Sequence, residues 1–196
     1  MVRAFNFMAD GFKGNSYATL PEHAKLGVLL HRAIDDFADS APEAKSMAQP
    51  LLPYAGKSYK VALDLLCDFY LHQHWQKFDT RSKNAFIDQC YAEIAAHEEF
   101  AKGRIQTLLR PMIAGKWING YAYPEGIYAT ARGLNKRFPG MDNLEKGLRY
   151  GIEHPEVFEP LFMKLYPALL QNTLDFAKSH TEALSLAHHD LFLYQD

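Results

Sequence analysis

Apolar residues recur every three or four positions along most of this chain, which is the spacing of amphipathic helices. Alternating apolar and polar residues, the pattern of strands, are almost absent, and Leu, Ala, Lys, Glu and Met outweigh Val, Ile and Thr. Two prolines, Pro160 and Pro167, are expected to bend or break the last predicted helix. The pattern predicts helices over residues 21–39, 43–54, 58–77, 80–101, 104–115, 121–137, 141–151 and 155–186.

The predicted helices follow one another without a repeat, a low-complexity segment or a linker long enough to divide domains. At 196 residues the chain is long enough for one sizeable domain. We therefore expect a single compact multi-helix domain of the all-α class over residues 1–196. Residues after about 186 are expected to fray as a tail.

Composition narrows the classes of function. The chain is 48% hydrophobic and 22% charged, and its net charge of −2 argues against a nucleic-acid surface. Cys67 and Cys90 lie far apart without a CxxC motif, which favours reduced thiols in a reducing compartment. The apolar runs are too short to span a bilayer, and no signal peptide opens the chain. A cytoplasmic enzyme or binding protein is expected.

The predicted helix at 21–39 places acids beside an imidazole. His31, Asp35 and Asp39 follow one another at four-residue intervals, so a helix brings them onto one stripe next to its apolar face. The stripe is typical of a site that holds a metal or moves a proton. A simpler interpretation stays open, in which Asp35 accepts a hydrogen bond from His31 and Asp39 is solvated.

The predicted helix at 58–77 carries a second polar stripe. Asp64, Asp68 and His72 share it, and apolar residues cover the rest of the helix. Buried carboxylates need a partner, a proton or a metal. Oxygen and imidazole ligands suit Mg²⁺, Mn²⁺ or Fe rather than a thiolate zinc site. The alternative is a buried aspartate that caps a loop or pairs with an arginine such as Arg32.

A third acid, Asp10, follows an apolar run and precedes a Gly-Phe-Lys-Gly turn. Lys13 in that turn is suited to meeting a phosphate. An ordinary helix C-terminus closed by glycine and lysine explains the same residues. The chain has no GxSxG, Walker or GxGxxG motif, so serine hydrolases, NTPases and Rossmann enzymes have no support.

Together these motifs resemble those of the bacterial acyl carrier protein phosphodiesterases. Residues 7–14 are similar to that family's IADFVKG segment, and residues 27–39 to its GI..HR.ID.FTD segment. Residues 64–75 are similar to its D...DHFL..HW segment, and residues 162–167 to its F..FYP segment. The order and spacing match across most of the chain.

The resemblance implies an all-helical fold distantly related to the HD-domain phosphohydrolases. It also implies a divalent-metal phosphodiesterase, usually assayed with Mn²⁺, with Mg²⁺ or Fe as alternatives. Its substrate would be holo acyl carrier protein, an acidic helical protein from which it removes the 4′-phosphopantetheine arm. The residue roles carried over are metal binding by Asp10, His31, Asp35 and Asp68; catalysis by Asp35, Asp64 and Asp68; and substrate contacts by Arg32, Lys13 and Trp75.

Two departures from the family pattern keep other functions open. Phe69 stands where the family has a histidine after the second aspartate of D...DHF. The family's MNFLAH-like segment begins about a dozen residues before its ADF motif, and this chain starts nine residues before Asp10 without that histidine. One alternative is a catalytically impaired relative that binds acyl carrier protein or another phosphate ligand. The other is a helical scaffold whose acids pair with cations.

Overall fold

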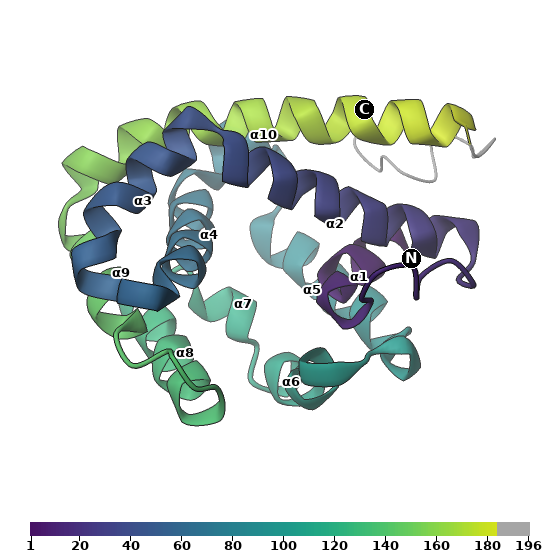
Figure 1. The fold of residues 1–196 in the computed structure, drawn as a ribbon, viewed down its shortest axis with the longest axis horizontal. Coiled ribbons are helices and arrows are strands. Elements are labelled where there is room, and N and C mark those ends of the chain that lie inside the picture. The colour runs from purple at the N-terminus through teal and green to yellow at the C-terminus, as the bar shows by residue number, and fades with distance from the viewer. Residues whose placement is uncertain (184–196) are drawn as a thin grey trace. The chain divides into compact units, whose positions relative to one another are not determined.

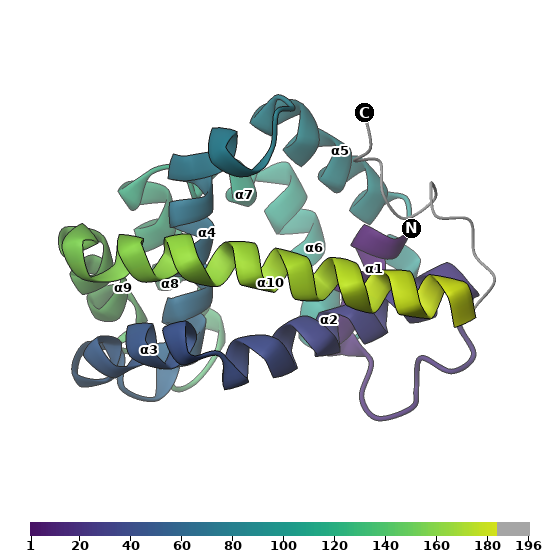
Figure 2. The same ribbon diagram turned by 90° about the horizontal axis from the view of Figure 1, so that it is seen from above.

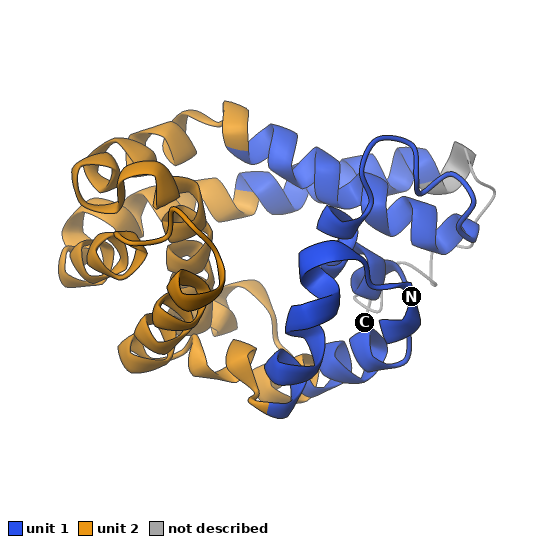
Figure 3. Ribbon diagram, turned by 60° about the horizontal axis from the view of Figure 1, so that its bottom comes forward, with its two compact units in different colours: residues 1–38, 88–114, 168–196 blue, residues 39–87, 115–167 orange. Residues whose placement is uncertain are grey.

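The computed structural model describes residues 1–183, and every regular element in that range is a helix (Figure 1). The predicted all-α class is confirmed. The chain divides into two compact units, coloured separately in Figure 3. Unit 1 holds residues 1–38, 88–114 and those from 168 onward, and unit 2 holds residues 39–87 and 115–167. The single-domain organisation stays a prediction, and the predicted tail after about residue 186 lies outside the described residues.

Each unit is built from helices that come from separated stretches of sequence. Unit 1 contains α1 (Val2–Phe7), η1 (Ala9–Gly11), nearly all of α2 (Glu22–Ser40), η3 (Glu98–Phe100) and α6 (Gly103–Ala114). Unit 2 contains α3 (Pro42–Ala55), η2 (Gly56–Ser58), α4 (Tyr59–Phe78), α7 (Trp117–Gly120), α8 (Pro124–Arg137) and α9 (Leu144–Glu153). The residues of α5 (Lys83–Ala95) and α10 (Pro155–Ala183) are shared between the units.

Phe5 is at the centre of the aromatic core of unit 1. It is 1% exposed, and its ring lies 6.0 Å from that of Phe12, 5.3 Å from that of Phe100 and 5.8 Å from the imidazole of His97. Tilted and edge-on aromatic contacts of this kind are favourable beyond the area they bury. The core therefore joins α1 to the short segment that follows η1 and to the region of η3.

A close backbone approach packs α1 against α2. A Cβ atom added at Gly27 of α2 would lie 2.5 Å from the carbonyl oxygen of Val2 and 2.8 Å from the Cβ of Phe5. It would also lie 3.0 Å from the backbone nitrogen of Asn6. Real Cβ atoms do not approach backbone atoms so closely, so only glycine fits. His31 lies four residues after this contact.

Unit 2 is organised around α9, which packs on α3 and α4 (Figure 1). Gly147 of α9 faces Ala55 of α3, and an added Cβ would lie 2.5 Å from the Ala55 Cβ. One turn later Gly151 faces Leu66 of α4, where an added Cβ would lie 2.6 Å from a leucine methyl group. The hydroxyl of Tyr70 donates to the Gly151 carbonyl oxygen at 3.0 Å. Small residues on α9 thus allow α4, which carries Asp64 and Asp68, to pack closely.

Two helix predictions differ from the structure. Residues 80–101 form α5 and η3, with a break at His97, whose Nδ1 lies 2.8 Å from the Glu93 carbonyl oxygen. The side chain there engages the backbone of the preceding turn. The last helix, α10, runs unbroken through Pro160 and Pro167 (Figure 2), so the predicted break is wrong.

Replacing Gly27 by alanine should destabilise the protein by about 1–3 kcal/mol, because the added methyl group must displace backbone atoms of α1. Chemical denaturation followed by circular dichroism measures the free energy of unfolding.

Gly133→Ala in α8 is the matched control. Its added Cβ would meet only the end of the Arg137 side chain, at 3.2 Å, which can move. We expect an unchanged free energy of unfolding, or a gain of up to about 1 kcal/mol from the better helix propensity of alanine. Equal losses in the two variants would contradict a role for the Gly27 contact.

Candidate functional site

The candidate site in unit 1 is formed by one imidazole and two carboxylates. His31 Nε2 lies 3.4 Å from Asp10 Oδ1 and 3.3 Å from Asp35 Oδ2. Asp35 comes from the next turn of α2, as the four-residue spacing predicts. Asp10 comes from η1, a separate element. The structure therefore brings three of the predicted metal residues together.

Packing explains how Asp10 reaches the imidazole. The Gly27 contact fixes the end of α1 against α2 one turn before His31. On the other side of Asp10, a Cβ at Gly11 would lie 3.0 Å from the backbone oxygen of Lys102. Glycine on each side of the site thus permits two close backbone approaches, and these place η1 next to the middle of α2.

The three side chains of this site differ in exposure. The Asp10 and Asp35 side chains are 76% and 61% exposed, whereas the His31 side chain is 25% exposed. The hydrogen bond and the charge of His31 hold the pKa of Asp10 below its usual range, against a smaller opposing effect of burial. Asp10 is therefore ionised at neutral pH and accessible to a ligand from solvent.

Arg32, a predicted phosphate contact, holds a backbone loop in this structure. Its Nη2 donates to the carbonyl oxygens of Phe12 at 2.9 Å and Gly14 at 2.7 Å. The guanidinium carbon lies 4.7 Å from the centre of the Tyr17 ring. Lys13, the other predicted phosphate contact, is exposed and lies between the two bonded carbonyls in sequence.

Asp64 and Asp68 lie on α4, in unit 2. Asp64 is exposed and Asp68 is partly buried. Burial, together with the charge of Asp64 one turn earlier, raises the pKa of Asp68 to about 7. Burial and the same two carboxylates also raise the pKa of the Cys67 thiol. The polar stripe predicted for this helix is present. Burial of Asp68 disfavours its charged form, an effect that fully exposed acids do not have.

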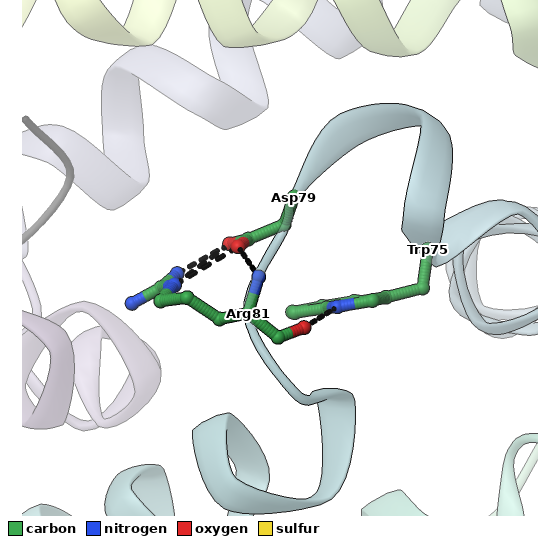
Figure 4. Close-up of polar contacts among 3 residues, drawn as sticks. All are labelled: Trp75, Asp79 and Arg81. Atoms are coloured by element: carbon green, nitrogen blue, oxygen red, sulfur yellow. Dashed lines mark hydrogen bonds and ion pairs between the residues drawn. The ribbon is translucent and has the colours of Figure 1, made fainter. Parts of the chain in front are cut away.

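Trp75, a predicted substrate contact, lies in the last turn of the same helix. It is 8% exposed, and its indole nitrogen donates to the Arg81 carbonyl oxygen at 2.8 Å (Figure 4). The Arg81 side chain in turn pairs with Asp79, which also accepts from the Arg81 backbone nitrogen at 2.8 Å. These bonds fix the turn between α4 and α5. The substrate contact by Trp75 stays a prediction.

Phe69, which replaces the family histidine, is 9% exposed and contacts the edge of the Tyr70 ring. Its side chain has no polar atom, so this position contributes only packing.

His72 completes the polar stripe of α4 and is buried with its Nδ1 unpaired. Burial, and to a smaller extent the charge of Lys83, lowers its pKa to about 4. The helix departs from helical geometry two residues later, at His74, whose Nε2 lies 2.9 Å from Glu159 Oε1. His72 is therefore a neutral buried group at physiological pH.

The donor chemistry of the unit 1 site suits a hard divalent cation, because carboxylate oxygens and an imidazole nitrogen are ligands that Mn²⁺ and Mg²⁺ accept. Within residues 1–183, no three His, Cys, Asp or Glu side chains stand in a ready-made ligand arrangement. In this structure His31 Nε2 contacts both carboxylates directly, at 3.4 Å from Asp10 Oδ1 and 3.3 Å from Asp35 Oδ2.

Tyr17 was not among the residues singled out from the sequence, although it completes the Arg32 contact. It is one of 11 tyrosines in the chain and has no periodic relation to Arg32. Tyr17 and Arg32 are 15 positions apart in the sequence, and no helical or strand period connects residues at that separation. Only the folded loop identifies it.

The described residues thus form an all-α protein with an exposed carboxylate–imidazole site, and they include no helix that is both long and apolar enough to cross a membrane. The family model for acyl carrier protein phosphodiesterase matches residues 1–169. The chain belongs to the acyl carrier protein phosphodiesterase family.

Individual relatives agree with this assignment. The chain is 29% identical over 167 residues to an acyl carrier protein phosphodiesterase of Pectobacterium atrosepticum, covering 85% of this chain and 86% of the relative. It is 27% identical over 168 residues to the protein of that name from Yersinia pestis, with the same coverage. No solved structure matches the chain significantly, so the distant relation to HD-domain proteins stays a prediction.

The buried imidazole of His72 predicts a loss of stability in acid. The unfolded chain takes up a proton near pH 6.5, whereas the folded protein resists it until about pH 4. The contribution of His72 to the free energy of unfolding should be fully retained above pH 6.5. Between pH 6.5 and 4, His72 should lower it by about 1.4 kcal/mol per pH unit. Urea unfolding at a series of pH values measures the slope.

The variant His72→Gln should lose this part of the slope, since glutamine does not titrate. His154→Gln, at a side chain that is 42% exposed, is the control and should keep the wild-type slope. Identical pH dependence in wild type and His72→Gln would show that His72 is not held neutral by burial.

Proposed function

We propose that this protein hydrolyses the phosphodiester that joins 4′-phosphopantetheine to a serine of holo acyl carrier protein. In this reaction the oxygen of water bonds to phosphorus, and the bond from phosphorus to the serine oxygen breaks. The serine oxygen takes up a proton, which leaves apo acyl carrier protein and free 4′-phosphopantetheine. Family membership supports the reaction class, and the names of the relatives support the substrate.

The observation that carries this proposal is the position of His31 between Asp10 and Asp35. Two motifs of the N-terminal region supply these residues. Asp10 comes from η1, and His31 and Asp35 come from α2. The two carboxylates contact the imidazole, and their side chains are 76% and 61% exposed, so a ligand can reach them from solvent. A helical scaffold whose acids merely pair with cations does not need two acids on one partly exposed histidine.

We propose a divalent cation, Mn²⁺ in the first place and Mg²⁺ or Fe as alternatives, as the cofactor. Asp10, His31 and Asp35 of unit 1 would hold it, and the metal-binding role of Asp68, which lies in unit 2, stays a separate prediction. When bound, such an ion lowers the pKa of a water molecule and neutralises phosphoryl oxygens. Asp64 is proposed to act with Asp68, and Lys13 to contact the diester anion.

We further propose a cytoplasmic location. The support comes from the sequence, in which Cys67 and Cys90 lie far apart without a CxxC motif.

Conversion of holo to apo acyl carrier protein in the presence of Mn²⁺, followed by intact-protein mass spectrometry, tests the function. His31→Ala and Asp35→Asn should lower kcat/KM by about 100-fold or more, since each removes a proposed ligand. Removal of the metal by a chelator should abolish turnover, and added Mn²⁺ should restore it.

Asp36→Asn is the matched control for that experiment. Asp36 is exposed on the same helix, adjacent to Asp35 in sequence and on another face, and should leave kcat/KM within about twofold. Folded wild-type protein that neither takes up metal nor converts holo acyl carrier protein would contradict the proposal.

Phe69 favours a second candidate function, binding of holo acyl carrier protein without turnover. Binding without turnover predicts a measurable dissociation constant by calorimetry and no change in the mass of holo acyl carrier protein. In that case Phe69→His, which restores the family residue in α4, should create turnover. Turnover by the wild type would exclude this second function.

A further inference from the structure

The segment between η1 and α2 is anchored at three points by one side chain. Arg32 Nη2 donates one hydrogen bond to the Phe12 carbonyl oxygen and one to the Gly14 carbonyl oxygen, at 2.9 and 2.7 Å. Its guanidinium also lies against the Tyr17 ring, with 4.7 Å between the guanidinium carbon and the ring centre. Because Nη2 carries two hydrogens, the two carbonyls use both of them.

The anchored segment also has turns of its own. Ser16 donates its backbone N–H to the Lys13 carbonyl oxygen at 3.1 Å, and Ala18 donates to the Asn15 carbonyl oxygen at 2.9 Å. Each of these is a single local bond in an exposed stretch, so they are insufficient to fix the path of the chain. The contacts of Arg32 connect that path to α2.

Lys13 lies between the two anchored carbonyls and three residues after Asp10. Its side chain is exposed and makes no hydrogen bond or ion pair with any side chain in residues 1–180. The free cation of this segment is thus Lys13, whereas the cation of Arg32 is already engaged with backbone oxygens and an aromatic ring.

We propose that Arg32 is a positioning residue that acts through Lys13, and that Tyr17 is part of the same device. The identity of the substrate in this inference rests on the proposed function. Arg32 and Tyr17 hold residues 12–17 in one path, and Lys13 on that path contacts the anionic phosphodiester beside Asp10. The division of roles follows from chemistry, since a planar guanidinium can lie flat on an aromatic ring while it donates to two carbonyls, whereas an ammonium has no plane to stack.

Backbone amide hydrogen exchange tests the anchoring without any substrate. Arg32→Ala and Tyr17→Leu should each speed exchange of the Ser16 and Ala18 amides by about tenfold or more. Tyr17→Phe keeps the ring and should exchange as wild type does. Lys25→Ala, which removes a half-buried lysine of α2 that pairs with Glu22, should do the same. Unchanged exchange in Arg32→Ala would overturn the anchoring.

A double-mutant cycle tests the action through Lys13. Lys13→Ala and Arg32→Ala should each raise KM for holo acyl carrier protein by about tenfold with kcat within about twofold. The double variant should be no more than about twofold worse than Lys13→Ala alone, because the loop then has no cation to position. Multiplied effects in the double variant would show that Arg32 contacts the substrate directly and would overturn the proposal.

Arg32→Lys separates charge from geometry. This variant keeps the positive charge and replaces the planar guanidinium by an ammonium, so KM should stay close to that of Arg32→Ala. Full rescue of KM by lysine would overturn the proposal. If the wild type does not hydrolyse holo acyl carrier protein, the proposed function fails on its own. The double-mutant cycle of Lys13 and Arg32 is then measured on the affinity for inorganic phosphate by NMR titration. The same non-additivity is expected, and full additivity would overturn the positioning role.

Discussion

The site of unit 1 depends on one packing constraint, the backbone contact between α1 and α2 at Gly27. The Val2 carbonyl oxygen lies 2.5 Å from where a side chain would begin, so the two helices approach as closely as their backbones permit. This contact sets the direction in which the chain leaves α1, and therefore where η1 carries Asp10. Without it, His31 and Asp35 would keep their helical spacing, but the acid from the other motif would have no fixed place beside them.

Close approach at glycine recurs in unit 2, where it supports α4. Gly147 and Gly151 let α9 lie directly on Ala55 and Leu66. The gain in burial on these faces accompanies a cost elsewhere on α4, because Asp68 is partly buried and raised in pKa. Close packing on one side of α4 thus coexists with a carboxyl group of raised pKa on the same helix. Such groups concentrate at functional sites.

The polar contacts divide into those that hold backbone and those left for a ligand. The Trp75 indole fixes the turn after α4 and the Arg32 guanidinium fixes the loop before α2. Both residues belong to motifs of the family, and both are engaged with backbone carbonyls in the folded protein. Lys13 and the exposed oxygens of Asp10 and Asp35 are the groups that face solvent. Motif residues thus include side chains that hold the backbone as well as side chains that stay accessible to solvent.

The sequence alone determined the all-α class and the pairing of His31 with Asp35, because both depend on a helical period that is local along the chain. It also indicated Asp10 and Arg32 as members of one site, but not how they serve it. The tertiary structure decided that Asp10 reaches His31 and that Arg32 bonds the Phe12–Gly14 backbone. It also decided that α10 continues through its prolines. The physical reason is that these outcomes depend on contacts between elements, where backbone approach and hydrogen-bond geometry in three dimensions override the local pattern.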